Sequence, residues 1–162
     1  MSNQVYANSV SRYDLANTAS GSYVKTAVQS IPDVATTRVV GWSSSVDKGL
    51  SAVVSIVSDE FVFDKAGVYH IQFNWLFNAN ATGSRKGSIL LTPAVGSAQR
   101  LGNVEIVNGG VGARVEAQSV LVWKMEAGDK ISLEVAQNSG APLDLFGDAT
   151  DPRTNVVITR VA

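Results

Sequence analysis

Hydrophobic and polar residues alternate along most of this chain, in short runs separated by turn residues. The clearest run is Val68–Asn78, where large apolar side chains occupy every second position: Tyr69, Ile71, Phe73, Trp75 and Phe77. Because successive side chains of a strand point to opposite faces of a sheet, this spacing predicts a strand with one wholly apolar face. The positions in between are mixed: His70, Gln72, Asn74 and Leu76. That mixture favours a central strand whose second face meets something other than bulk water.

Similar runs recur from residue 27 to the end. The predicted strands are Thr37–Ser43, Ala52–Val57, Glu60–Phe63, Val68–Asn78, Gly87–Leu91, Asn103–Val107, Arg114–Met125, Lys130–Gln137, Leu143–Phe146 and Asn155–Val161. Turn residues lie between them, as in Ala127-Gly128-Asp129, where the glycine supplies a special backbone angle and Asp129 caps neighbouring N–H groups. No helical window of convincing length follows residue 27. Many short strands with frequent turns predict an all-β sandwich or barrel.

Residues 1–26 differ from the rest, because they are polar and show little periodicity. We expect an irregular N-terminal arm here, with a short helical turn near Asp14–Asn17, followed by one β domain over 27–162. Two hypotheses remain open for the arm: a disordered terminus, or an anchor that becomes ordered on a partner surface. Tyrosine offers contact area at low entropic cost, so three residues of the arm are the candidate anchors: Tyr6, Tyr13 and Tyr23.

Composition narrows the classes of function. The chain has 162 residues, enough for one domain with a proper core, and no cysteine, which excludes disulfides and thiolate chemistry. Lys and Arg total 13 against 14 Asp and Glu, a balance that gives no reason to expect nucleic acid or an anionic membrane as partner. The first residues lack the features of a signal peptide, and no stretch is long and apolar enough to span a bilayer. We expect a product made in the cytoplasm that stays there or leaves within a particle.

Several segments together resemble one family. Phe61-Val62-Phe63 followed by Ala66-Gly67-Val68-Tyr69-His70-Ile71 resembles its strand, turn and Gly-x-Tyr-x-apolar signature. The stretch from Val120 to Leu133, with Ala127-Gly128-Asp129 at its turn, resembles its late hairpin, and 154–161 its closing strand. Residues 29–42 are similar to the entry strand of its microbial and phage members. The family is the C1q/TNF-like jelly roll, and the resemblance covers about residues 27 to 162.

This resemblance implies a ten-stranded jelly-roll sandwich that assembles as a compact homotrimer. It places trimer contacts on the strands Val68–Asn78, Arg114–Met125 and Lys130–Gln137, with these interface residues: Tyr69, Ile71, Phe73, Trp123, Leu133 and Val135. Which face of each strand meets the threefold axis is left open. The absence of a collagen-like repeat favours a microbial or bacteriophage virion protein over a secreted animal member.

The sequence predicts no catalytic site. His70 is the one histidine and lies within a strand pattern, while Asp59 and Glu60 are adjacent and therefore point to opposite faces. No nucleophile elbow, phosphate loop or dinucleotide fingerprint is present. Three aspartates in a loop-rich stretch could gather around calcium, although solvated turn carboxylates are the default interpretation: Asp144, Asp148 and Asp151. We therefore expect no cofactor and no metal.

The leading functional hypothesis is a non-enzymatic virion protein, a trimeric capsid decoration, knob or head-fibre module held to other virion proteins by its N-terminal arm. The alternative is a receptor- or glycan-binding tip of a phage tail fibre or bacterial adhesin. In that case the loops around Arg85, Gly96 and Asp148 would recognise the host surface. A hydrolase on a β scaffold would need a cluster of carboxylates or hydroxyls that the sequence does not show.

Overall fold

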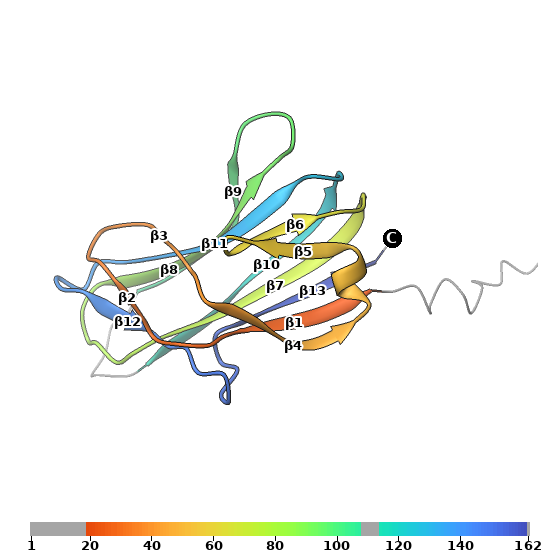
Figure 1. Ribbon diagram of the computed structural model, residues 1–162. Coiled ribbons are helices and arrows are strands. Elements are labelled where there is room, and N and C mark those ends of the chain that lie inside the picture. The colour runs from red at the N-terminus through yellow and green to blue at the C-terminus, as the bar shows by residue number, and fades with distance from the viewer. Residues whose placement is uncertain (1–18, 108–113, 162) are drawn as a thin grey trace, which may run out of the picture.

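The computed structural model describes residues 19–107 and 114–161. These residues form two antiparallel β-sheets packed face to face, as Figure 1 shows. They contain 13 strands and a single turn of 3₁₀ helix, η1 (Leu50–Ala52), with no α-helix among them. The predicted all-β sandwich is therefore confirmed.

Sheet A has seven strands in the order β2-β12-β7-β13-β1-β4, and β10 pairs with the remaining edge of β7. Its strands are β1 (Ser20–Lys25), β2 (Gln29–Ile31), β4 (Trp42–Lys48), β7 (Gly67–Phe77), β10 (Val115–Met125), β12 (Leu143–Leu145) and β13 (Asn155–Arg160). Sheet B has six strands in the order β5-β6-β11-β8-β9, and β3 pairs with β11. Its strands are β3 (Thr37–Arg38), β5 (Val54–Val57), β6 (Glu60–Phe63), β8 (Ser84–Thr92), β9 (Gln99–Val107) and β11 (Lys130–Gln137).

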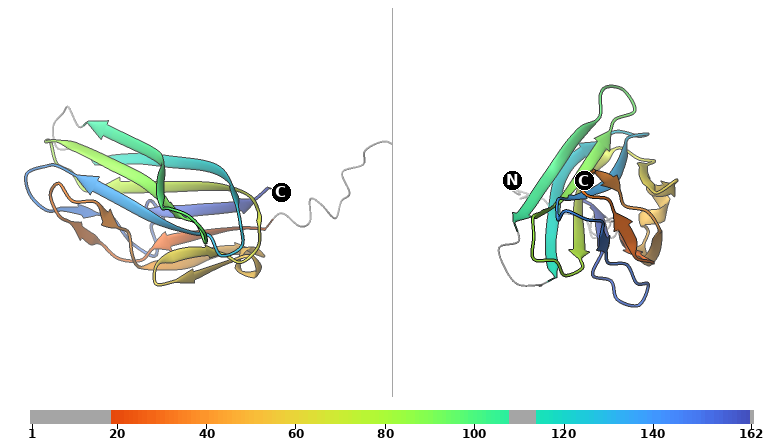
Figure 2. Two further views of the ribbon diagram at one scale, coloured as in Figure 1. Left: turned by 90° about the horizontal axis from the view of Figure 1, so that it is seen from above. Right: turned by 90° about the vertical axis from the view of Figure 1, so that its left-hand side faces the viewer.

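The strands lie along the long axis of the molecule, and the end of β13 lies beside the start of β1 (Figure 2). Ser20 at the start of β1 pairs with Thr159 near the end of β13, so both ends of the domain meet at one pole. The loop between β8 and β9 projects from the sandwich as the green arch of Figure 1.

The core fills the space between the two sheets. The apolar face of β7 is fully buried there, as its alternating pattern predicts. Aromatic rings from both sheets meet edge to face, with centroids 4.6 Å apart for Phe63 and Tyr69 and 5.0 Å apart for Tyr23 and Phe61. Such contacts stabilise the packing of the sheets beyond the effect of apolar burial alone.

The predicted strand Thr37–Ser43 is two strands in two sheets. Gly41 has a φ of 81°, in the left-handed region, and marks the place where the chain passes from β3 in sheet B to β4 in sheet A. Because glycine adopts this conformation without steric cost, the chain can change sheets within three residues of Arg38.

Strand β1 lies between β13 and β4, within the part of the chain that the sequence assigns to the N-terminal arm. Its residues alternate poorly, because the inward position Gly21 carries no side chain. A β-carbon there would approach Leu50 and the Val46 carbonyl to 2.9 Å. The outward residues Ser20 and Ser22 are small, so the sequence of this strand shows no clear alternation of apolar and polar side chains.

Candidate functional site

The outward face of sheet A is the candidate functional surface. Strand register aligns its side chains in rows across β10, β7 and β13: Val122–His70–Thr159, Val120–Gln72–Val157 and Gln118–Asn74–Asn155. We call these residues the uncharged face, because none of them carries a carboxylate, an ammonium or a guanidinium group. Val120 is 43% exposed and Val122 58% exposed, so apolar surface lies open at its centre.

Amide side chains on the uncharged face bond to one another across the strands. Gln118 Nε2 donates to Asn74 Oδ1 at 2.8 Å, and Asn74 Nδ2 donates to Asn155 Oδ1 at 2.8 Å. Asn155 Nδ2 in turn donates to the carbonyl of Pro152. Since these polar groups already have protein partners, covering them leaves fewer groups unsatisfied than covering free amides would.

The outward face of sheet B has the opposite character. Its ion pairs are Arg38–Glu60 at 3.0 Å, Lys130–Glu60 at 3.9 Å, Lys86–Glu105 at 3.0 Å and Arg100–Glu134 at 2.7 Å. On sheet A the charged residues of β10 lie at its ends, where Glu116 and Lys124 are exposed and Lys124 pairs with Glu126 at 2.6 Å, so the uncharged face is the central part of that sheet. Charge depletion with exposed apolar residues is the composition of the centre of a protein interface, whereas ion pairs are usual on a solvated face.

The structure corrects the expected set of interface residues. Five of the six lie in the core between the sheets, where each is at most 1% exposed: Tyr69, Ile71, Phe73, Leu133 and Val135. A neighbouring subunit cannot contact side chains that their own chain already encloses. Strands β7 and β10 do have a second, open face, which is formed by the residues that alternate with the predicted ones. The sequence-based prediction missed Gln118, Val120 and Val122 on this face. The signal that could have found them is the uncharged run of alternate positions in the middle of both strands, between Glu116 and Lys124 on β10 and from His70 to Asn74 on β7.

Trp123 is the exception among the six. It is 40% exposed and lines a groove of about 480 Å³ under the loop between β8 and β9. Pro93, Ala94 and Val95 form the loop side of this groove. Trp123 pairs with Tyr69, whose side chain points inward, so it lies on the inner side of edge strand β10 and outside the uncharged face.

The expected anchor tyrosines fall into two groups. Tyr6 and Tyr13 lie outside the described residues. Tyr23 lies on β1 with 6% of its surface exposed and packs against Phe61, so it is part of the core. Burial raises the pKa of its phenol, and Asp47 adds to the shift. The Tyr23 side chain is therefore not available to anchor the chain to a partner.

The three aspartates considered for calcium do not gather. Asp148 Oδ1 accepts hydrogen bonds from Thr150 N at 2.8 Å and Thr150 Oγ1 at 2.7 Å, and these lower the pKa of the carboxyl group. Asp151 pairs with Arg153 at 3.0 Å. Across 19–107 and 114–161, no group of three or more His, Asp or Glu side chains is arranged to hold a metal ion. His70 lies on the uncharged face between Val122 and Thr159, in a row that offers no carboxylate to a histidine base.

The recognition loop expected around Arg85 is also corrected. Arg85 lies in β8 and is fully buried. Its guanidinium donates to the carbonyls of Thr82 at 2.9 Å and Ser84 at 3.0 Å, and burial lowers its pKa. It supports the turn before β8 from within and is not available to a ligand. Gly96 does lie in the projecting β8–β9 loop, and Asp148 in an exposed turn.

No helix within the described residues has the length and apolar character needed to cross a membrane. No protein-family model matches the sequence, and comparison with curated proteins finds no match.

Solved structures show the fold. Murine APRIL at pH 8.0 superposes with a TM-score of 0.70 at 16% identity, over 89% of this chain and 99% of that one. The TNF protein Eiger from S. frugiperda superposes with a TM-score of 0.69 at 10% identity, over 90% of this chain and 93% of that one. Murine APRIL at pH 5.0 gives 0.71 at 16% identity, over 89% and 99%. The chain therefore has the jelly-roll fold of TNF-type proteins.

Proposed function

We propose that this chain is a non-enzymatic structural and binding protein that assembles as a homotrimer through the uncharged face of sheet A. The observation that carries the proposal is the contrast between the two outward faces. The exposed valines and bonded amides of sheet A suit burial against another subunit, while the ion pairs of sheet B suit water. The TNF-type fold supports three copies in preference to two.

The mass of the protein in solution tests the assembly. Light scattering after size exclusion is expected to give about three times the chain mass of 17.1 kDa. A species at the mass of one chain that persists at high concentration would contradict the proposal, and a stable dimer would contradict the threefold arrangement.

We further propose that the trimer is a virion component, a capsid decoration, knob or head-fibre module held by the residues before β1. The support comes from the resemblance to microbial and phage jelly rolls and from the position of β1. Because β1 starts at one pole of the domain, the three β1 strands of a trimer with parallel subunits would all start at the same end. Identical arms on one body raise the effective concentration of each on a symmetric lattice.

Particle binding tests this second step separately from the first. Purified capsids of the parent virus should retain the full chain and lose a chain that lacks residues 1–18. Equal retention of both proteins would show that the arm is not the attachment. A trimer that binds no virion particle would leave the assembly intact and contradict the virion role.

A further inference from the structure

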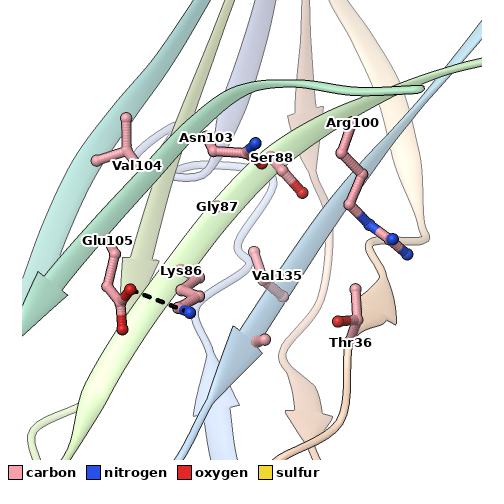
Figure 3. A pocket seen from close by; sticks show the side chains of 10 residues that line it. Thr36, Lys86, Gly87, Ser88, Arg100, Asn103, Val104, Glu105 and Val135 are labelled. Atoms are coloured by element: carbon pink, nitrogen blue, oxygen red, sulfur yellow. Dashed lines mark ion pairs between the residues drawn. The ribbon is translucent and has the colours of Figure 1, made fainter.

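The outward face of sheet B contains a groove of about 400 Å³ (Figure 3). Strands β8, β9 and β11 form it together with the segment before β3, and polar side chains line it: Thr36, Lys86, Ser88, Arg100, Asn103 and Glu105. A second hollow of about 250 Å³ shares Thr36, Lys86 and Ala136 with the first and extends it toward Asn138. The two together make one elongated groove, which we call the sheet B groove.

A β-bulge builds the wall of the sheet B groove. Gly87 pairs with Val104 and Ile89 with Leu101, so Ser88 opposes two residues of β9, and the extra residue Gly102 has a φ of 59°. Arg100 and Glu105 are separated by an odd number of positions and would point to opposite faces of a regular strand. The bulge places both on the outward face, where Figure 3 shows them along one strand with Asn103 between them.

Charge in the groove is balanced. Lys86 Nζ pairs with Glu105 at 3.0 Å, and Arg100 Nε pairs with Glu134 at 2.7 Å. The Glu134 side chain is only 11% exposed, so this carboxylate holds the Arg100 guanidinium in place across β8. Because each cation has its own carboxylate, the groove offers no net attraction to an anion or a cation. It offers hydrogen-bond donors and acceptors at fixed positions.

The floor and rim add two features. Ala136 provides a small apolar floor between the polar groups, while the Val135 side chain lies beneath it in the core. Val34 lies at the rim with a φ of 52°, a strained conformation for a β-branched residue, and its N–H donates to the Gln137 carbonyl at 2.8 Å. Strain kept in this way is found where the local geometry serves a purpose.

We propose that the sheet B groove binds a neutral oligosaccharide. Hydroxyl groups both donate and accept, which matches alternating cationic and carboxylate partners, and the C–H face of a sugar ring matches the apolar floor. The elongated shape fits several sugar units in a row. The groove lies on the sheet opposite the uncharged face, so this inference does not depend on trimer assembly.

Titration of the ¹⁵N-labelled full chain with neutral hexasaccharides tests the proposal by NMR. The probes are maltohexaose, cellohexaose, chitohexaose and mannohexaose, with a sulfated heparin hexasaccharide beside them. At least one neutral probe should shift amide signals of Lys86–Ser88 and Arg100–Glu105. Asn103→Ala and Glu105→Gln should each weaken that binding by about tenfold, while Glu60→Gln, an equivalent change to an ion-paired glutamate of the same face outside the groove, should not.

The proposal is overturned if none of the neutral probes shifts these signals at millimolar concentration, or if only the heparin fragment does. It is also overturned if Glu105→Gln and Glu60→Gln bind alike. The mass of each sample, measured alongside, shows whether the assembly has changed, so loss of sugar binding and loss of the trimer are read independently.

Discussion

Trp75 lies directly against the bare backbone of Gly87, where a β-carbon would come within 1.9 Å of the indole Nε1. The two residues belong to different sheets, so this contact sets how closely β7 and β8 approach. Gly87→Ala should therefore lower the free energy of unfolding by roughly 1–3 kcal/mol, the usual cost of overpacking a core, and more if the indole cannot move. Urea unfolding of both proteins measures the difference.

A second substitution, at the other partner of the clash, provides the control. Trp75→Phe removes the indole nitrogen, the atom that the new methyl group would approach most closely, at the cost of a cavity. If the clash is the cause, the double variant should be more stable than the sum of the two single effects predicts. Strictly additive losses would show that Gly87→Ala acts through the backbone and not through Trp75.

A charge placed on the uncharged face should separate the subunits. Val122→Lys puts an ammonium group at a position that is 58% exposed in the single chain and buried in the proposed trimer. An unpaired charge is costly to bury, so the variant should have the mass of one chain while its circular dichroism stays unchanged.

The matched control is Val57→Lys. Val57 is 55% exposed at the end of β5 in sheet B, so the same substitution at nearly the same exposure should leave the mass unaltered. Dissociation of both variants, or of neither, would argue against the uncharged face as the contact.

Two truncations distinguish the arm from the sheet. Removing residues 1–18 should leave the thermal midpoint within error of the full chain, because β1 begins at Ser20. Removing residues 1–26 should unfold the protein, since it deletes β1 and leaves β13 and β4 without the strand that joins them. A folded product of the longer truncation would contradict the assignment of β1 to sheet A.

The carboxyl group of Asp148 should titrate below its ordinary pKa of 3.8, because the Thr150 N–H and hydroxyl bond to its charged form. Thr150→Ala removes the hydroxyl and should raise this pKa part of the way back, as followed by the ¹³C shift of the carboxyl carbon. A folded-state pKa below the unfolded value means that the contribution to stability is present above 3.8 and is lost as the pH falls through the folded pKa. An unchanged pKa in the variant would assign the shift to the backbone bond alone.

Sequence patterns predicted the strands whose side chains alternate cleanly. Strand β7 was expected at Val68–Asn78 and lies at Gly67–Phe77. The turn after β10 also behaves as expected, since Gly128 has a φ of 90° and Asp129 accepts a hydrogen bond from Glu126 N, three residues before it, at 2.8 Å. These features depend on local chemistry, which a sequence states directly.

Features that depend on the partner sheet were not predictable. Strand β9 was expected at Asn103–Val107 but begins at Gln99, because the bulge at Gly102 interrupts the alternation on which the prediction rests. Strand β8 begins at Ser84, three residues before the expected start, since the buried Arg85 bonds to carbonyls and so occupies an inward position usually taken by an apolar residue. The sequence also suggested a second contact surface on β7, but only the register with β10 and β13 shows which side chains share it.

The position of β13 between β7 and β1 has a consequence for how the protein is made. During synthesis, β1 and β7 leave the ribosome long before Asn155–Arg160, so the middle of sheet A stays open until β13 has been translated. Open strand edges pair readily with other chains, and chains that end early would keep these edges exposed. Closure of sheet A therefore requires Asn155–Arg160: a chain that stops before these residues cannot join β7 to β1.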